Sequence, residues 1–277
     1  MNAPQVAMLS GNRLHLHHGP IDLIIWAEGT EVARAYAQAV ARFEGLLAEL
    51  CSELDALRNP VPQPLQGPIA QRMAAAVAPF RPAFVTPMAA VAGAVADTIL
   101  AAMCHGTGLA RAYVNNGGDI AVHLTPDQSL TTAIAAPGQA RLVLRHNLPA
   151  RGIATSGRGG RSFSRGIADA VTVVARTAAM ADAAATMIAN AVDLPGHPAI
   201  TRQPARALQA DSDLGDILVT TALGPLTQGE IAQALSNGEA AARAFAATGL
   251  IAGAALFLHS QCRTLGDLSL EKEHALV

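Results

Sequence analysis

The chain has 277 residues, a formal net charge of −2 at pH 7, 51% hydrophobic residues and 14% charged residues. This apolar fraction excludes intrinsic disorder as a description of the whole chain, because disorder needs low hydrophobicity and high charge. The near-neutral charge argues against nucleic acid as an obligate partner. About one residue in five is Ala and Lys272 is the only lysine, which excludes Schiff-base and P-loop chemistry from the body of the chain.

Cysteine usage and the first residues bear on the compartment. The first twenty residues contain no basic region followed by an apolar one, so we expect no secretory signal. Cys51, Cys104 and Cys262 lie far apart, which predicts neither a disulfide framework nor a structural zinc site. We therefore expect a cytoplasmic location. The apolar stretch Thr86–Cys104 carries Asp97 in its second half, so a buried helix is the better interpretation and no membrane is expected.

The first half of the chain predicts two strands followed by helices. Alternation of polar and apolar residues predicts strands over Asn12–His18 and Ile21–Trp26. An apolar stripe at helical spacing predicts one long helix from Thr30 to about Leu57. A proline-rich loop follows over 59–68, and then a short helix over Ile69–Val77.

The second half predicts mostly strands. An Asn-Gly turn within 111–124 predicts a hairpin. A T-x-x-E capping box at Thr227 predicts a helix from about Leu226 to Ala247. A further helix is expected over 177–193, and further strands over Ser129–Ala136, Ala140–Arg145, Arg151–Thr155, 168–176, Asp216–Ala222 and Leu250–Leu258. Clustered strands favour an α+β layered fold with an antiparallel sheet flanked by helices. We expect one domain over 1–265, divisible into two intimate subdomains, and a polar tail over 266–277.

Two glycine-rich segments are candidate ligand sites. In the first, Asn116, Gly117, Gly118 and Asp119 allow the backbone to approach a ligand closely; the alternative is an ordinary tight hairpin. In the second, residues 154–166, small residues expose backbone N–H groups that bind anions. Arginine side chains suited to phosphate accompany them; the alternative is a flexible surface loop. The residues concerned are Thr155, Ser156, Gly157, Arg158, Arg161 and Arg165.

Two helices carry isolated polar residues. Asp182 and Thr186 are spaced to lie one turn apart on one helix face, where a carboxylate and a hydroxyl could share a hard cation such as Mg²⁺. The alternative has Asp182 favouring the helix dipole and Thr186 packed in the core. Asp97, on a helix of small apolar residues, must find a partner or face a cavity.

His15 and His17 share a strand face but lack further ligands at metal spacing, so an ordinary strand is preferred. No G-x-G-x-x-G follows a strand and no G-x-S-x-G occurs. A Rossmann dinucleotide site and an α/β-hydrolase triad are therefore not supported.

The order of these segments resembles the ApbE superfamily of FAD:protein FMN transferases, and most closely its compact cytosolic branch. The similarity covers roughly Ala83–Asp193. PMAAVAGAVAD (87–97) is similar to the family helix ending in Asp, and NNGGDI (115–120) to its glycine pair. ATSG (154–157) matches its flavin-site motif, and DAVTVVA with ADAAAT (169–186) resembles its metal-site segment.

The resemblance implies a function and a set of site residues. It implies Mg²⁺ held by Asp182, Thr186 and the backbone carbonyl of about Ala89, with FAD as substrate or ligand. The segments 87–97, 154–160 and 181–186 are expected to line one cleft. The implied catalytic residues are Asp182 and, in place of a missing family loop, Asp169, with Ser164 as the alternative substitute. The implied flavin-binding residues are Asp97, Asn116, Gly117, Gly118, Asp119, Thr155, Ser156, Gly157, Arg158 and Arg161.

The activity implied is transfer of FMN from FAD to a Ser or Thr of an acceptor protein, or cleavage of the FAD pyrophosphate. This chemistry depends on a metal that neutralises phosphate charge. Ala92 stands where the family has a lysine, and the family's His/Asp loop is missing. Two alternatives remain: an enzyme on the same scaffold acting on another anionic small molecule, and a non-catalytic flavin-binding protein. The Ala-rich helices could also pack a homodimer.

Overall fold

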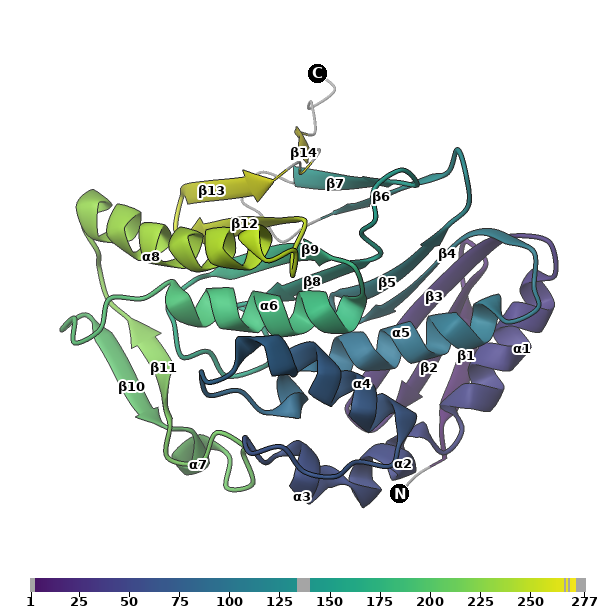
Figure 1. The fold of residues 1–277 in the computed structure, drawn as a ribbon, viewed down its shortest axis with the longest axis horizontal. Coiled ribbons are helices and arrows are strands. Elements are labelled where there is room, and N and C mark those ends of the chain that lie inside the picture. The colour runs from purple at the N-terminus through teal and green to yellow at the C-terminus, as the bar shows by residue number, and fades with distance from the viewer. Residues whose placement is uncertain (1–2, 134–139, 267, 269, 273–277) are drawn as a thin grey trace. The chain divides into compact units, whose positions relative to one another are not determined.

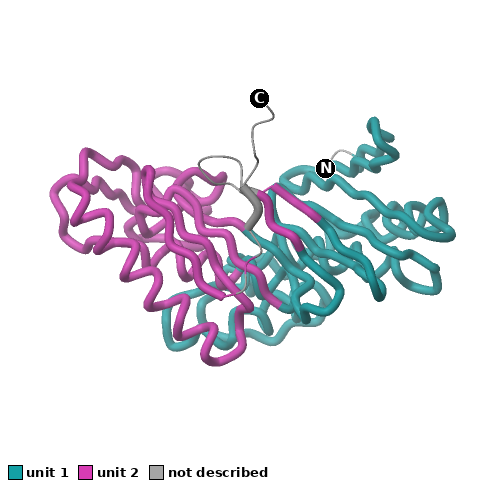
Figure 2. Tube along the Cα trace, turned by 90° about the horizontal axis from the view of Figure 1, so that it is seen from above, with its two compact units in different colours: residues 1–130, 144–154, 176–182 teal, residues 131–143, 155–175, 183–277 magenta. Residues whose placement is uncertain are grey.

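The computed structural model describes residues 3–133, 140–266, 268 and 270–272. The chain divides into two compact units, coloured separately in Figure 2. Unit 1 comprises Met1–Leu130, Leu144–Ala154 and Arg176–Asp182, and unit 2 comprises Thr131–Val143, Thr155–Ala175 and Ala183–Val277. The boundary passes through one strand, β8 (Gly152–Ser156), and one helix, α6 (Ala178–Ala191).

Unit 1 contains an antiparallel sheet. Its strands follow the order β1 (Gln5–Leu9), β2 (Arg13–His18), β3 (Ile21–Gly29), β4 (Leu109–Asn116), β5 (Asp119–Leu124) and β8. Alternation in the sequence produces this sheet, since every second side chain of β2 and β3 is buried, as at Leu14, Leu16 and Leu23. The predicted strands at 12–18 and 21–26 and the predicted hairpin are confirmed.

The expected single helix from Thr30 to Leu57 is wrong. The structure has three helices there: α1 (Val32–Phe43), α2 (Leu46–Ser52) and α3 (Leu54–Leu57). The first break falls at Gly45, whose φ of 77° lies outside the helical region. The apolar stripe continues across the break because α1 and α2 each bury one face, so the periodicity concealed the interruption.

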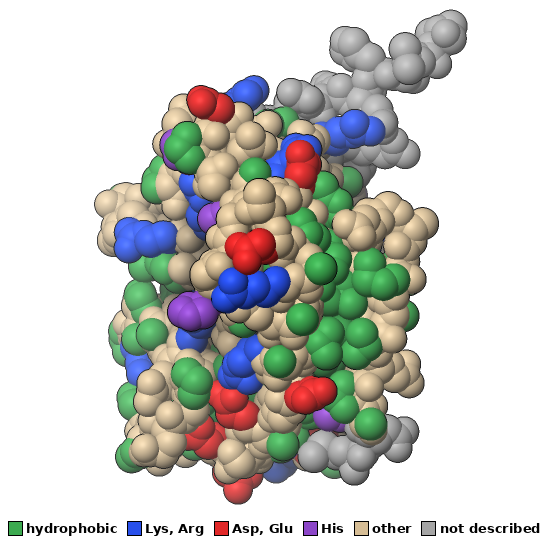
Figure 3. Space-filling view, turned by 90° about the vertical axis from the view of Figure 1, so that its right-hand side faces the viewer, with side chains coloured by type: hydrophobic (Ala, Val, Ile, Leu, Met, Phe, Trp, Pro, Cys, Tyr) green, Lys and Arg blue, Asp and Glu red, His purple; other side chains and the backbone are tan. Residues whose placement is uncertain are grey.

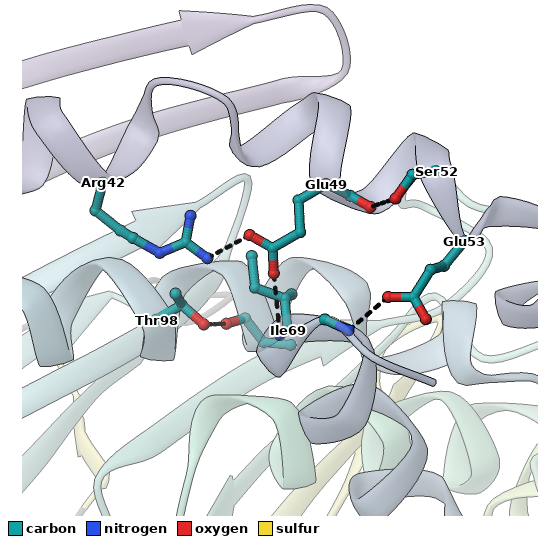
Figure 4. A network of polar contacts seen from close by, with 8 residues as sticks. Arg42, Glu49, Ser52, Glu53, Ile69 and Thr98 are labelled. Atoms are coloured by element: carbon teal, nitrogen blue, oxygen red, sulfur yellow. Dashed lines mark hydrogen bonds and ion pairs between the residues drawn. The ribbon is translucent and has the colours of Figure 1, made fainter. Parts of the chain in front are cut away.

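The residue directly before helix α4 (Pro68–Val77) is Gly67, which has no side chain to cap the helix. Carboxylates from the preceding segment serve instead, as Figure 4 shows. Glu49 accepts hydrogen bonds from the Ile69 N–H at 3.4 Å and from Arg42 at 2.7 Å. Glu53 accepts one from the Gly67 N–H at 2.7 Å. A carboxylate at a helix N-terminus is favourable because it pairs with free N–H groups and with the helix dipole.

The apolar segment next in the chain forms two short 3₁₀ turns, η1 (Ala78–Phe80) and η2 (Pro87–Ala90), and helix α5 (Val91–Cys104). Figure 1 shows α1, α4 and α5 on one face of the unit 1 strands, and α5 packs on β4 and β5. Among the described residues, only Pro87–Cys104 has the length and hydropathy of a membrane span. Half of that segment is buried inside the protein, which agrees with the predicted buried helix.

The edge of the unit 1 sheet carries exposed apolar side chains. In β1, Val6 and Met8 are 52% and 57% exposed, although their strand partners Leu16 and Leu14 are buried. Figure 3 views the molecule from the side on which Figure 1 draws β1 and α1, and hydrophobic side chains gather there beside charged ones. Val6 and Met8 therefore lie on the same face of the sheet as the buried leucines of β2, but the helices of unit 1 do not cover them.

Unit 2 contains antiparallel strands with one long helix. The pairs run β9 (Ala170–Ala175) to β12 (Gly253–Leu258) to β13 (Gln261–Gly266), and helix α8 (Gln228–Ala247) packs on β12 and β13. The predicted capping box is confirmed: Thr227 accepts from the Glu230 N–H, and Glu230 accepts from the Thr227 N–H. A hairpin of β10 (Ile200–Pro204) and β11 (Leu218–Leu223) encloses the short helix α7 (Ala205–Leu208).

A separate sheet has the order β14 (Leu270–Lys272), β7 (Ala140–Arg145) and β6 (Ser129–Ala133). The backbone of 270–272 pairs with β7 although that segment is predicted as a tail. The last residues of the strand predicted at 129–136, and residues 267, 269 and 273–277, lie outside the described residues. Mixed helices and antiparallel sheets confirm the predicted α+β class.

Candidate functional site

Asp182 lies in the second turn of α6, and its carboxylate meets the start of α5. Asp182 Oδ2 accepts a hydrogen bond from the Gly93 N–H at 3.0 Å. Gly93 is the third residue of α5, so the carboxylate satisfies one of the N–H groups that every helix leaves without an intrahelical partner. Helices α5 and α6 approach each other closely here, because a Cβ atom added at Gly93 would lie 2.6 Å from the Ala179 N. The predicted segments 87–97 and 181–186 therefore meet through these residues of unit 1.

Asp97 makes the converse contact. From α5, its two carboxylate oxygens accept hydrogen bonds from the N–H groups of Ala178 at 3.1 Å and Ala179 at 3.0 Å, the first two residues of α6. Thr177 completes the same helix start, since its hydroxyl accepts from the Met180 N–H at 3.2 Å. We expected Asp97 to need a polar partner, and that partner is the backbone of α6.

Burial and charge together shift the acid strength of these groups. Burial raises the pKa of Asp182 well above its ordinary value, and the nearby negative charges of Asp119 and Asp97 raise it further, while N–H donors of α5 lower it. Burial also raises the pKa of Asp97, against the lowering effect of the Ala179 and Ala178 N–H groups. Burial and the neighbouring charges thus disfavour the ionised form of Asp182, and a bound cation would favour it.

The Asn-Gly-Gly turn also meets the start of α5. Both glycines have positive φ, 64° at Gly117 and 113° at Gly118, as the sequence predicts. Asn115 holds the turn by accepting from the Gly118 N–H at 2.8 Å. The buried Asn116 donates from Nδ2 to the Ala92 carbonyl at 3.1 Å. The turn is therefore fixed against α5, and Asp119 follows it as the first residue of β5.

The two other predicted metal ligands have definite places in the fold. Ala89 lies in the 3₁₀ turn η2 that leads into α5, and Thr186 follows Asp182 by one turn on α6. Within the described residues, no group of three or more His, Cys, Asp or Glu side chains is arranged to hold a metal ion. The predicted set differs in kind, because it combines one carboxylate with a hydroxyl and a carbonyl, oxygen ligands that suit Mg²⁺.

The second glycine-rich segment lies mostly in unit 2, and its backbone is already paired. The N–H groups of Arg158, Gly159 and Gly160 donate to the carbonyls of Ala168, Asp169 and Gly157. The expected row of free N–H groups for an anion is therefore wrong for these three residues. The sequence could not show this, because two of the acceptors lie on residues 168–169 after the loop and the third lies within the loop itself.

Neighbouring side chains of this segment are also engaged. Thr155 and Thr172 share a hydrogen bond between their hydroxyls at 2.9 Å. Ser156 is half-buried at the end of β8, and Gly157 is buried beside the Asp169 carbonyl. Arg161 is exposed on the loop. Their predicted roles toward a flavin stay predictions.

Asp169 has both carboxylate oxygens occupied. Its Oδ1 accepts from Arg158 at 2.7 Å, and its Oδ2 accepts from the His259 N–H at 2.6 Å. Its own N–H donates to Phe257. Asp169 thereby ties the glycine-rich loop to the turn after β12, which favours a structural role. Proton transfer by Asp169 stays a prediction.

The strand histidines have a carboxylate beside them that the sequence spacing did not reveal. His15 pairs with Asp22 of the neighbouring strand at 2.6 Å, and the His15 and His17 rings are 6.3 Å apart.

Sequence reasoning did not identify two positions at the start of the paired helices. Gly93, in the Ala-Gly-Ala of 92–94, permits the close approach of α6. Thr177 caps α6. A glycine inside an otherwise unbroken helical pattern is the signal for the first. A threonine directly before the helix is the signal for the second.

The chain is similar in sequence to several curated proteins. It is 42% identical over 130 residues to a UPF0280 protein of Methanothrix thermoacetophila, covering 45% of this chain and 52% of that protein. It is 43% identical over 136 residues to a UPF0280 protein of Methanosphaerula palustris, covering 47% of this chain and 55% of that protein. The chain thus spans about half the length of the curated relatives it matches.

A solved structure, the apo form of the flavinyl transferase ApbE of Pseudomonas stutzeri, aligns with a TM-score of 0.44 and 13% identity, covering 96% of this chain and 95% of that one. A family model described as AbpE bacteria matches residues 6–267. That match covers nearly the whole chain and includes both helix starts and the Asn-Gly-Gly turn. The chain therefore belongs to the AbpE bacteria family, as the resemblance to ApbE proteins predicts.

Proposed function

We propose that this protein binds a flavin dinucleotide with a divalent metal ion and acts on the bond between its phosphates. Family membership supports a flavin-related function. The observation that carries the proposal is the place of Asp182: a half-buried carboxylate at the start of α5, one turn before Thr186 and beside the charge of Asp119.

The residues present fit a divalent cation. Burial raises the pKa of Asp182 and repulsion by Asp119 raises it further, and a bound cation would relieve that repulsion. Asp182 and Thr186 would supply a carboxylate and a hydroxyl, and Ala89 would add its carbonyl. When bound, the metal would neutralise charge on phosphate oxygens and stabilise the charge that develops as the bond breaks.

The chain's own groups would bind and orient. Gly93 fixes Asp182 Oδ2 through its N–H, which leaves the carboxylate held in one position. Asn116 keeps the Asn-Gly-Gly turn against the start of α5. Arg161, exposed on its loop, is a candidate phosphate ligand.

The proposal has two finer parts. The first is the reaction: transfer of FMN to a Ser or Thr hydroxyl of an acceptor protein with release of AMP, or hydrolysis to FMN and AMP where water replaces the acceptor. The second is the compartment, which we propose to be cytoplasmic. The three cysteines are free, as suits a reducing environment.

The test follows FAD with Mg²⁺ by chromatography of FMN and AMP. Wild-type protein should release AMP in a metal-dependent manner, and Asp182→Asn should reduce the rate by more than the about 10–100-fold that loss of an outer-shell partner of a metal ligand costs. The matched control is Asp55→Asn, at an exposed aspartate of α3. FAD that binds and stays intact would refute the reaction and leave a carrier. No FAD binding, measured by fluorescence quenching, would refute the flavin function.

A further inference from the structure

Two aspartates join the starts of α5 and α6 in both directions. Asp97, carried by α5, accepts from the first two N–H groups of α6, at 3.1 and 3.0 Å. Asp182, carried by α6, accepts from the third N–H group of α5 at 3.0 Å. Each carboxylate therefore caps the helix that carries the other.

Local caps do not replace these contacts. The residue before α5 is Ala90, which offers no side-chain hydrogen bond. At α6, the Thr177 hydroxyl pairs with the Met180 N–H and leaves the Ala178 and Ala179 N–H groups to Asp97. Buried N–H groups without acceptors are costly, so each helix start depends on the other helix.

The packing makes the pair of contacts rigid. A Cβ at Gly93 would lie 2.6 Å from the Ala179 N and closer still to the Ala178 carbonyl, so α5 and α6 touch through their backbones. A shift at one contact is passed to the other, because about one turn of helix separates the two contacts on α5 and on α6. Asp182 follows Ala178 by about one turn of helix.

We propose that Asp97 is a positioning residue for Asp182: by capping α6 it holds the turn that presents the Asp182 carboxylate to α5 and to a bound metal. The part of this inference that concerns the metal rests on the proposed function. The link from Asp97 to Asp182 rests on geometry alone. Both Asp97 oxygens are taken up by backbone N–H groups. Asp97 therefore acts on the site through α6, and the flavin-binding role expected from the resemblance stays a prediction.

The first test is amide hydrogen exchange in the protein without metal or flavin. Asp97→Asn should accelerate exchange at the Gly93 N–H by roughly tenfold or more, although Asp97 makes no bond to that group, because loss of a charge-assisted cap frees the Asp182 turn. The reciprocal variant Asp182→Asn should accelerate exchange at Ala178 and Ala179. The matched control is Thr227→Ala, which removes a helix cap from α8 and should leave all three groups unchanged.

The second test measures Mn²⁺ binding directly by electron paramagnetic resonance. Asp97→Asn should weaken binding by roughly tenfold, whereas Thr227→Ala at comparable loss of stability should not. The carboxyl ¹³C resonance of Asp182 should move in Asp97→Asn and stay in place in Thr227→Ala.

The outcomes separate the two claims. Unchanged Gly93 exchange in Asp97→Asn, with only Ala178 and Ala179 opened, would overturn the positioning role. Wild-type protein that binds no Mn²⁺ would overturn the proposed metal function, while exchange and the Asp182 resonance would still decide the positioning role. If Asp97→Asn does not fold, Asp182→Asn decides it, and unchanged exchange at Ala178 and Ala179 would overturn the link.

Discussion

The substitution Gly93→Ala tests the close contact between the starts of α5 and α6. The added methyl group would lie 2.6 Å from the Ala179 N, whereas ordinary contacts are about 3.5–4.0 Å. The helices must therefore separate by roughly 1 Å, which stretches the 3.0 Å bond from the Gly93 N–H to Asp182.

Three effects contribute to the change in stability. Overpacking costs about 1–3 kcal/mol, and the stretched hydrogen bond to a charged group costs about 1.5–3 kcal/mol. Higher helix propensity of Ala returns about 1 kcal/mol. We expect a net loss of about 3 kcal/mol, or roughly 6–12 °C in the unfolding midpoint for a chain of this size.

Urea unfolding followed by circular dichroism measures this loss. The matched control is Gly229→Ala, also near a helix start, where an added Cβ meets nothing within 4 Å. The control should be neutral or stabilising by up to about 1 kcal/mol. Equal stability of the two variants would refute the close approach of α5 and α6.

The remaining predictions concern one helix cap and two titrating groups. Thr227→Ala should cost about 1 kcal/mol in urea unfolding, because it removes the acceptor of the Glu230 N–H; an unchanged midpoint would contradict the capping box. The Thr227 N–H and His197 hold the pKa of Glu230 at about 2, below its ordinary 4.5. Its contribution is therefore present above pH 4.5 and lost as the pH falls toward 2. Unfolding curves of wild type and Glu230→Gln should converge over that window, and parallel curves would refute it. Burial raises the pKa of Asp182, and a metal binds the ionised carboxylate, so Mn²⁺ affinity should keep rising with pH above the range in which an ordinary aspartate is already ionised; a flat profile there would count against Asp182 as a ligand.

Local patterns predicted the elements that are decided locally. The turn at Gly117 and Gly118 was predictable because both positions need positive φ. The cap at Thr227 was predictable because it lies within four residues of its partner. The break at Gly45 was missed because the apolar stripe runs through it, and β1 was missed because its residues are mostly exposed and show no alternation of burial.

The site was predictable in its residues and less so in their contacts. Asp97 and Asp182 stood out because charge is scarce in their helices. What each carboxylate contacts depends on residues more than 80 positions away, and no local rule reaches that far. The free N–H groups expected at 158–160 were wrong for the same reason, since their acceptors lie on the later stretch 168–169 and within the loop itself.

Carboxylates from other parts of the chain cap the starts of α4, α5 and α6, and this affects the order in which these helix starts form. The start of α4 is completed by Glu49 and Glu53, within about twenty residues, whereas those of α5 and α6 are completed across 81 to 89 residues. Closing the longer loop costs more entropy and lies later on the way to the native state. Peptides covering α5 or α6 alone should therefore be frayed at their first turns, and in refolding the amides of Gly93 and Ala178 should gain protection together, after those of α4.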